Sequence, residues 1–364
     1  MNKVKKIINH IPLLNKLAHY VVKIYVDAKL YSVSLKRIKK NLKNRGRTIF
    51  YLGIPVHTNL GDLAQGVCIR EWIKKNYPDC TVIEIETNAI VNTKFSVLKN
   101  IKKYYKVNDF IVFQSGYTTT DLGGFADEMH KSVMQSLPEA KMLMMPQTIF
   151  FKSEDRKRQT ADCYNSMKHM LFLARDRVSY GMAKEMFPDI PVRQFPDIVT
   201  TFIGKYSFNY KREGILFCRR NDSEKYYSDE EIASLIEKCK SIADVEQTDT
   251  TKSGRKNDIV KNAKQYIESE LDRYAHYKLI ITDRYHGTIL SLVAGTPVII
   301  IKTNDHKVVT GAEWFKGVYD DYVYLADSLE DSYRIAKKLY FEERNYQLEP
   351  YFERAYYDKL PTLF

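Results

Sequence analysis

The sequence has few cysteines, and their placement gives no support for a disulfide framework. The five of them are odd in number and scattered through 364 residues, with no spacing typical of metal ligands or redox pairs. They are Cys68, Cys80, Cys163, Cys218 and Cys239. Dispersed cysteines of this kind are typical of a reducing compartment, so we expect a cytoplasmic protein.

Long apolar runs are also missing. No stretch approaches the roughly 18 apolar residues that a membrane-spanning helix needs. Lysines interrupt every apolar run near the first residue, which is unlike a secretory signal. The loop after the first predicted strand lacks the G-x-G-x-x-G pattern of dinucleotide sites. No paired carboxylates or His-rich cluster suggest a metal site, so we expect neither a metal nor an organic cofactor.

The composition is that of a folded chain with an uneven charge. Hydrophobic residues make up 44% and charged residues 28%, which is typical of a globular protein, and the length suits two domains. The formal net charge is +12. Residues 1–48 hold thirteen Lys and Arg against one acid, Asp27, and the rest of the chain has equal numbers of acids and bases.

Residues 1–47 have the pattern of a basic amphipathic helical arm. Apolar residues recur at helical spacing from Val4 to Tyr25, with lysines between them. We favour an arm that lies in an anionic membrane surface. A helix packed on the protein's own surface, with solvated lysines, is the alternative. Nucleic acid is the least favoured partner, because the arm lacks a recognisable binding motif and has few aromatics.

Beyond the arm, short apolar strands alternate with helices, which is typical of parallel sheets covered by helices. The predicted strands are Thr48–Leu52, Thr81–Ile85, Asp109–Phe113, Lys141–Met145, Gly214–Cys218, Leu279–Ile281 and Val298–Ile301. We expect an α/β fold of two Rossmann-like βα domains facing a cleft, which is a GT-B-like architecture. The expected bounds are 48–205 and 206–330, with a C-terminal helix and tail, 331–364, packing on the body.

Three other segments are assigned from periodicity and composition. The pattern predicts one helix from about Asp155 to Phe172 and another from Ser328 to Tyr346. Thr118 to Gly124 is rich in Thr and Gly, which favours a loop that could face a ligand.

The most informative stretch is Lys278 to Ile301, which predicts strand, polar loop, helix, turn and strand. In parallel sheets ligands bind at the carboxyl ends of strands, where Asp283, Arg284 and His286 fall. Gly287 opens the helix, whose free N–H groups attract an anion. Together these residues suit a small phosphorylated or carboxylated molecule. Alternatively, Asp283 only caps the helix and Arg284 only pairs with a surface acid.

Two other strand ends carry candidate residues. Arg219 and Arg220 follow one strand, and a guanidinium group binds carboxylate or phosphate in a bidentate fork. They could equally form a surface pair. The loop after the first strand contains Asn59, Gly61 and Asp62. Asn59 and Asp62 suit a tight turn and a helix cap, and Gly61 suits a close backbone approach. Alternatively, this loop faces a ligand.

Several short motifs follow one another in an order that points to a known family. They are Asn59-Leu60-Gly61-Asp62, Phe110 to Gly116, Arg175-Asp176 with Ser179, Pro196-Asp197, Cys218-Arg219, Arg284-Tyr285-His286-Gly287, Gly295 to Val298, and Lys307. With these motifs the chain resembles the polysaccharide pyruvyl transferases, from about Thr48 to Phe315. The ungapped Arg-x-His-Gly stretch is the most specific of them.

The resemblance implies transfer of pyruvate from phosphoenolpyruvate to a sugar, as a cyclic ketal, with release of phosphate. Arg219 and Arg284 would bind the two anionic groups of the donor, with Tyr285, Gly287 and Lys307 beside them. His286 would deliver the proton to the methylene carbon, because its charge changes near neutral pH.

The acceptor would meet loops of the first domain. The candidate residues there are Asn59, Asp62, Ser115, Tyr117 and Asp121. We expect a sugar, with galactose one candidate, in a lipid-linked repeat unit of an exopolysaccharide or capsule. The protein would then be cytoplasmic and peripheral at the inner face of the cell membrane. The rival readings are a GT-B glycosyltransferase that uses a nucleotide-sugar and a non-catalytic scaffold for polysaccharide assembly.

Overall fold

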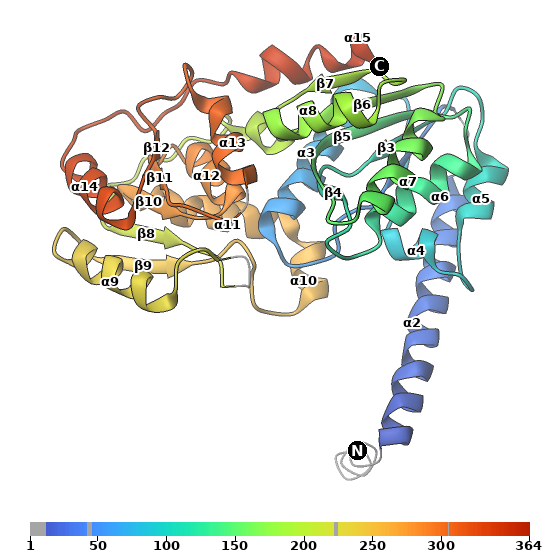
Figure 1. The fold of residues 1–364 in the computed structure, drawn as a ribbon, viewed down its shortest axis with the longest axis horizontal. Helices are drawn as coiled ribbons and strands as arrows, with labels where there is room; N and C mark the ends of the chain where they lie inside the picture. Colours follow the sequence, from blue (N-terminus) through green and yellow to red (C-terminus); the bar gives the residue numbers. More distant parts are fainter. Residues whose placement is uncertain (1–11, 42–45, 222–224, 305) are drawn as a thin grey trace.

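The chain forms two parallel β-sheets with helices packed on them, and one long helix stands out from this body (Figure 1). The computed structural model describes residues 12–41, 46–221, 225–304 and 306–364. Within them the predicted α/β class with an N-terminal helix is confirmed.

The first sheet has the strand order β2-β1-β3-β5-β6-β7, and β4 also pairs with β5. Its strands are β1 Thr48–Leu52, β2 Thr81–Ile85, β3 Phe110–Phe113, β4 Gly116–Thr120, β5 Lys141–Phe150, β6 Met170–Ala174 and β7 Val192–Gln194. The helical segments in this part are α3 Leu60–Asn76, α4 Thr87–Val91, α5 Leu98–Tyr104, α6 Ala126–Ser136, α7 Glu154–Asn165, α8 Arg177–Met186 and the 3₁₀ turn η1 Ile198–Phe202.

The second sheet has the order β12-β11-β10-β8-β9, and its pairings are also parallel. Its strands are β8 Ile215–Cys218, β9 Val245–Thr248, β10 Leu279–Thr282, β11 Val298–Ile300 and β12 Val323–Leu325. The helical segments that follow it are α9 Asp229–Lys240, α10 Lys256–Lys261, α11 Ala263–Ala275, α12 Tyr285–Val293, α13 His306–Ala312, η2 Glu313–Phe315, α14 Leu329–Tyr340, η3 Glu353–Tyr357 and α15 Leu360–Leu363.

Both faces of the first sheet are buried, which explains its continuous apolar strands. In β1 the side chains of Ile49 and Tyr51 join one hydrophobic cluster, while those of Phe50 and Leu52 join another. Successive side chains of a strand point to opposite faces, so a strand covered on both sides needs apolar residues throughout.

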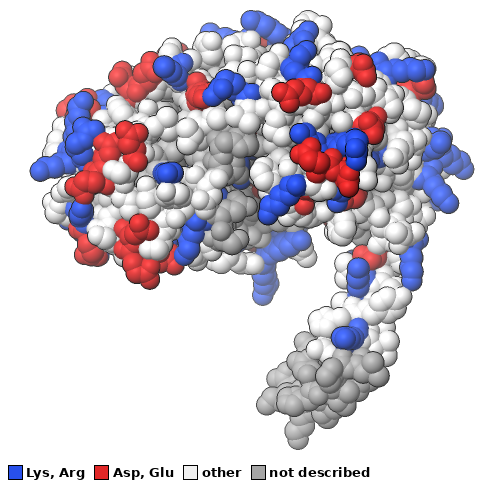
Figure 2. All heavy atoms as spheres, viewed as in Figure 1, with Lys and Arg blue, Asp and Glu red and all other residues white. Residues whose placement is uncertain are grey.

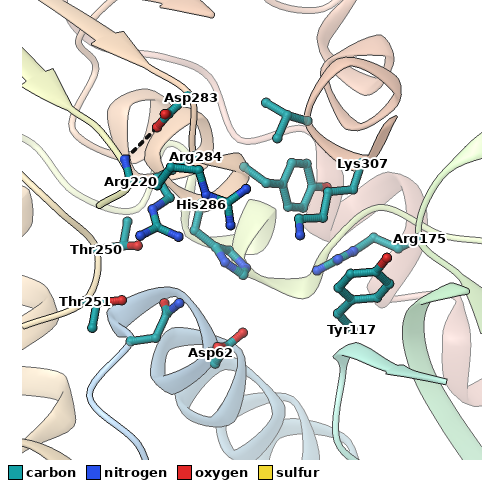
Figure 3. A pocket seen from close by; sticks show the side chains of 13 residues that line it. Asp62, Tyr117, Arg175, Arg220, Thr250, Thr251, Asp283, Arg284, His286 and Lys307 are labelled. Atoms are coloured by element: carbon teal, nitrogen blue, oxygen red, sulfur yellow. Dashed lines mark hydrogen bonds between the residues drawn. The ribbon is translucent and has the colours of Figure 1, made fainter. Parts of the chain in front are cut away.

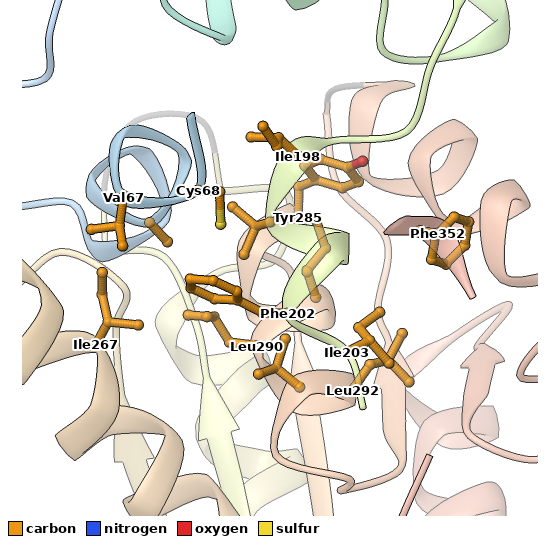
Figure 4. Close-up of a cluster of buried hydrophobic side chains, with 14 of the residues drawn as sticks. Val67, Cys68, Ile198, Phe202, Ile203, Ile267, Tyr285, Leu290, Leu292 and Phe352 are labelled. Carbon is orange, nitrogen blue, oxygen red and sulfur yellow. The ribbon is translucent and has the colours of Figure 1, made fainter. Parts of the chain in front are cut away.

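One of these clusters runs across the junction of the two sheet units. Ile198 and Phe202 of η1 lie among Val67 and Cys68 of α3 and Leu290 of α12 (Figure 4). Helix α3 follows the first sheet's β1, and α12 follows the second sheet's β10, so burial of this cluster holds the two units together.

Backbone hydrogen bonds join the same two units at one side of the cleft. The N–H of Leu60 donates to the carbonyl of Thr250 over 2.8 Å, and the N–H of Lys252 donates to the carbonyl of Thr58 over 3.0 Å. The loop before α3 therefore has a fixed position against the loop after β9.

Three of the predicted segments differ in the structure. The helix expected from Asp155 to Phe172 ends at Asn165, and Met170–Ala174 is the buried strand β6. A continuous apolar run fits a buried parallel strand as well as a helix, so periodicity could not separate them. The loop expected over Thr118 to Gly124 begins as strand β4, in which three threonines favour extended backbone.

The helix expected from Ser328 to Tyr346 is also shorter, because α14 ends at Tyr340. The helix after β10 begins earlier than its apolar segment suggested. It starts at Tyr285, so His286 lies in its first turn.

Helix α2, Pro12–Asn41, is attached to the body through its second half. Ile38 is fully buried, and Arg37 donates to the carbonyl of Glu84 over 2.6 Å. In the first half, Val22 and Tyr25 are 60% and 67% exposed, and this part projects from the molecule (Figure 2). The expected arm positions before Pro12, such as Val4, lie outside the described residues.

The C-terminal segment returns from the second sheet to the first (Figure 1). Tyr357 is buried, its hydroxyl donates to the carbonyl of Pro196 over 2.5 Å, and its own carbonyl accepts from the indole of Trp72 over 3.0 Å. Phe364 packs edge-on against Phe110 of β3. The segment therefore fills part of the core of the first unit.

We predict that Tyr357→Phe lowers the free energy of unfolding by about 1–2 kcal/mol, because the buried carbonyl of Pro196 loses its donor. Denaturant unfolding measures this loss. The matched control is Tyr351→Phe, whose side chain is 44% exposed and which should change stability by no more than about 0.5 kcal/mol. Equal effects of the two substitutions would contradict the prediction.

Candidate functional site

Residues from both sheet units surround one polar pocket of about 290 Å³ (Figure 3). Several follow the carboxyl ends of strands β6, β8, β9 and β10, where parallel sheets bind ligands. The lining residues are Asn59, Asp62, Tyr117, Arg175, Arg220, Thr250, Thr251, Asp283, Arg284, Tyr285, His286, Lys307 and Val308.

The loop between β10 and α12 fixes the position of His286. Thr282 ends the strand, donates its hydroxyl hydrogen to the carbonyl of Cys218 over 2.6 Å, and accepts from the N–H of Arg284 over 3.0 Å. Arg284 is the N-cap of α12. The imidazole of His286 is therefore held at the helix start, about 9% exposed.

Two glycines of the sequence motifs allow this close packing. A Cβ atom on Gly61 would lie 2.1 Å from Nδ1 of His286, and a Cβ atom on Gly287 would lie 2.4 Å from Oγ1 of Thr282. Any side chain at Gly61 would push α3 away from the histidine. The Asn-x-Gly-Asp motif thus lets the helix of one unit touch the histidine of the other.

The carboxylate of Asp197 is the buried centre of the site. Its Oδ2 accepts from Nε2 of Gln65 over 2.6 Å and from Nη1 of Arg175 over 3.0 Å. Nε2 of His286 lies 3.3 Å from the same oxygen, which is an ion-pair contact without the alignment of a hydrogen bond. The N–H of Val199 donates to Oδ1 over 3.0 Å.

The charge of Asp197 is set by these contacts. Burial alone would raise the pKa of this carboxyl group, but the neighbouring side chains of His286 and Arg175 and the N–H of Val199 outweigh it. The pKa of Asp197 is therefore held well below its usual range, and the group is a carboxylate at neutral pH.

The pocket carries more positive than negative side chains. Arg175, Arg220, Arg284 and Lys307 line it, against Asp62 and Asp283. The guanidinium of Arg284 is held by Asp249 (Nη2–Oδ2, 2.8 Å), and that of Arg175 lies 4.8 Å from the ring centre of Tyr285. Lys307 reaches across the cleft to 4.5 Å above the ring of Tyr117. The arrangement is suited to an anion with more than one charge.

Asp283 is a second buried carboxyl group at the pocket. It is 7% exposed and accepts from the backbone N–H of Arg220 over 2.8 Å. Burial raises the pKa of Asp283 to about 6, although the Arg220 N–H and the charge of Arg284 act in the opposite direction. The group therefore changes charge just below neutral pH.

The structure brings together most of the residues singled out from the sequence. Those that line the pocket are Asn59, Asp62, Tyr117, Arg220, Asp283, Arg284, Tyr285, His286 and Lys307. Arg219 does not line it. Its side chain is directed to Asp229 (Nη1–Oδ1, 2.8 Å) and Gln247, and the next residue, Arg220, lines the pocket instead.

Three other expected residues also lie outside this pocket. Ser115 donates to the carbonyl of Pro146 over 2.7 Å and lines a neighbouring pocket. Asp121 accepts from the backbone N–H groups of Lys152 and Ser153. Gly287 is buried behind His286 and acts through its lack of a side chain.

Sequence reasoning did not assign Arg175 and Asp197 to the site, and of the candidate pair Arg219 and Arg220 it assigned Arg219 to the donor. Arg175-Asp176 and Pro196-Asp197 are visible as motifs that follow strands. The signal present in the sequence was a charged residue directly after an apolar stretch, the same signal that located Arg284.

Within the described ranges, no helix is both long enough and apolar enough to cross a membrane. In that same part of the chain, no three His, Cys, Asp or Glu side chains lie close enough to share a metal ion.

The fold and the pocket define a GT-B-like α/β protein with a cleft between two Rossmann-like units that is rich in arginine and lysine. The family model for polysaccharide pyruvyl transferase matches residues 59–306, a range that contains the pocket residues except Lys307 and Val308. The chain belongs to this family of transferases.

Individual relatives are distant. Pyruvyl transferase 1 of Schizosaccharomyces pombe is 23% identical over 304 residues, which cover 78% of this chain and 74% of that protein. General stress protein 30 of Bacillus subtilis is 27% identical over 264 residues, covering 71% and 75%. Among solved structures, the UDP-GlcNAc 2-epimerase of Methanocaldococcus jannaschii has a TM-score of 0.52 at 12% identity, covering 88% of this chain and 100% of that one. This likeness shows the fold.

We predict that Asp283→Asn stabilises the protein at pH 7.5 but not at pH 4. The pKa of the wild-type carboxyl group is near 6 in the folded protein and near 4 in the unfolded chain. The contribution of this group to the free energy of unfolding is therefore complete below pH 4 and is lost as the pH rises through 6. The expected gain at pH 7.5 is about 3 kcal/mol. Denaturant unfolding at both pH values measures it, and a difference that does not change with pH would contradict it.

Proposed function

We propose that the protein transfers pyruvate from phosphoenolpyruvate to two hydroxyl groups of a sugar, forming a cyclic ketal and releasing phosphate. One observation carries this proposal: three arginines, a lysine and a histidine converge on a small pocket in a chain of the polysaccharide pyruvyl transferase family. Phosphoenolpyruvate is a small molecule with a phosphate and a carboxylate, and it needs several positive charges close together.

The donor would lie between the arginines of the two units. Arg220 and Arg284 follow neighbouring strands of the second sheet, and Arg175 faces them from the first (Figure 3). Guanidinium groups bind phosphate and carboxylate in a bidentate manner. Lys307 supplies a further charge that stabilises the phosphate as it leaves.

His286 is suited to protonate the methylene carbon of the donor. Its Nε2 lies against the buried carboxylate of Asp197, which can compensate a positive imidazole. The imidazole lines the pocket, so it can deliver a proton to a donor bound there. Protonation of C3 makes C2 electrophilic, and a sugar hydroxyl can attack it.

The two acceptor hydroxyl groups must lose their protons when they bond to C2. Asp62 lies in the pocket at the first turn of α3, and its carboxylate can accept a proton from the attacking hydroxyl. The first hydroxyl bonds to C2, the bond between C2 and the phosphate oxygen breaks, and the second hydroxyl closes the ketal. Of the two hydroxyl protons, one replaces that given to C3 and the other leaves with phosphate. These steps use only the side chains named, without a metal or an organic cofactor.

We further propose that the acceptor sugar is carried on a lipid at the cytoplasmic membrane face, as part of an exopolysaccharide or capsule repeat. Helix α2 supports this, because Leu17, Val22 and Tyr25 expose apolar surface on a segment next to many lysines. A basic amphipathic helix of this kind lies in an anionic membrane surface.

We predict that His286→Ala abolishes sugar-dependent phosphate release from phosphoenolpyruvate, a loss of at least about 100-fold. Release is measured with lipid-linked and synthetic glycosides, galactosides among them. Thermal stabilisation by phosphoenolpyruvate tests donor binding separately. Stabilisation by a nucleoside diphosphate instead, with no phosphate release on any acceptor, would favour a glycosyltransferase.

The neighbouring arginines provide a matched pair of variants. We predict that Arg220→Ala lowers kcat/KM for phosphoenolpyruvate by about 100-fold, as expected for losing a buried charged contact. Arg219→Ala, whose side chain faces Asp229, should change it by less than about threefold. A larger loss at Arg219 than at Arg220 would overturn this assignment of the donor site.

We predict that replacing Leu17, Val22 and Tyr25 by Ser reduces cosedimentation with phosphatidylglycerol vesicles by about tenfold or more. The reason is that each substitution removes apolar surface that would insert into the membrane. Activity on a soluble acceptor should persist. Substitution is a sharper test than deletion of residues 1–40, which would remove the buried Ile38. The control is Val107→Ser, an apolar side chain 91% exposed on the body. Unchanged vesicle binding by the triple variant would contradict the membrane proposal.

A further inference from the structure

A second pocket of about 430 Å³ adjoins the first, and the donor chemistry leaves it unused. It shares Asp62 and Tyr117 with the first pocket. The rest of its lining comes from the loop after β1, the start of α4, the residues after β3, strand β4 and the start of α6. The two pockets therefore meet at the carboxylate where we place the attacking hydroxyl.

The second pocket is less charged and more apolar than the first. Among its described lining residues there is no Lys or Arg, and Pro55, Val56 and Met129 form apolar wall. Phe125 lines it and is 59% exposed, which is unusual for a phenylalanine. A pyranose ring has apolar C–H faces and a polar hydroxyl edge, so an exposed aromatic ring beside polar groups suits it.

His130 supplies the second, independent observation. It lines this pocket from α6 and is fully buried. Its Nδ1 is paired with the hydroxyl of Tyr164 over 3.0 Å, while its Nε2 has no hydrogen-bond partner among the residues that the structure describes. Such a buried polar atom costs about 1–3 kcal/mol unless a ligand group satisfies it.

The ring of His130 is neutral at physiological pH. Burial lowers the pKa of His130 to about 3, and the charge of Lys131 acts in the same direction. A neutral imidazole has one N–H and one lone pair. It can pair with a hydroxyl or amide of a sugar, and it gives no attraction to an anion.

We infer that the second pocket binds the acceptor as an uncharged pyranose, with Phe125 against the ring face and Nε2 of His130 as the polar anchor. The hydroxyl edge then faces Asp62 and Tyr117, next to the donor. This assignment rests on the proposed function for the reaction, while binding of the sugar can be measured without turnover.

The test is ligand-observed NMR on the full chain with methyl β-galactoside, methyl β-glucoside and methyl N-acetyl-β-glucosaminide. Galactose 1-phosphate is the anionic comparison. We expect at least one neutral glycoside to bind the wild type, and inorganic phosphate, a probe of the first pocket, not to displace it. Phe125→Ala, an exposed position that leaves the core intact, should weaken binding about fivefold or more.

His130→Leu should weaken binding by a similar factor. Its control is Met134→Leu, on the same helix and 1% exposed but outside the pocket, which should leave binding unchanged. The inference is overturned if no neutral glycoside binds, if galactose 1-phosphate binds better, if phosphate displaces the sugar, or if Phe125→Ala has no effect.

The two proposals fail separately. Neutral glycoside binding that depends on Phe125, without any stabilisation by phosphoenolpyruvate, would remove the proposed donor and keep the sugar site. Phosphate release that depends on His286, with glycoside binding indifferent to Phe125 and His130, would keep the reaction and place the acceptor elsewhere.

Discussion

The buried carboxylate of Asp197 is the constraint on which the site depends. It joins Gln65 on α3, Arg175 after β6 and His286 on α12, and these elements belong to both sheet units. Breaking such a buried ionic group by removing one partner costs about 3–5 kcal/mol, because the remaining charge is left uncompensated. The charged side chains around Asp197 are therefore held in place by contacts within the protein itself.

Apolar packing makes this ionic centre possible. The buried cluster around Phe202 of η1 lies at the junction of the two units, and Asp197 is the N-cap of the same 3₁₀ turn. Gly61 then brings the start of α3 into contact with the ring of His286. The hydrophobic interface thus supports the polar site, because the attraction between a carboxylate and its positive partners is strong only where water is excluded.

Much of the architecture follows from the sequence, because buried parallel strands are continuous apolar runs and the residues after them fall at the ligand-binding edge. That argument located Arg284 and His286. It could not choose between Arg219 and Arg220, because the two point in different directions once the regular strand has ended at Cys218. The sequence also could not predict the hydrogen bond between Gln65 and Asp197, which lie 132 positions apart. That contact depends on how α3 and η1 pack in the folded chain.

The return of the C-terminal segment to the first unit bears on how the protein is made. Trp72 and Tyr357 are separated by 285 positions, and Pro196, one residue before the central carboxylate, receives the hydroxyl of the same tyrosine. Synthesis proceeds at about 5–20 residues per second, so Tyr357 would leave the ribosome roughly ten seconds or longer after Pro196. The first unit cannot complete its packing until then. The apolar side chains that pack with Tyr357 in the folded protein would stay uncovered for that time, which is when a chain is most prone to aggregate.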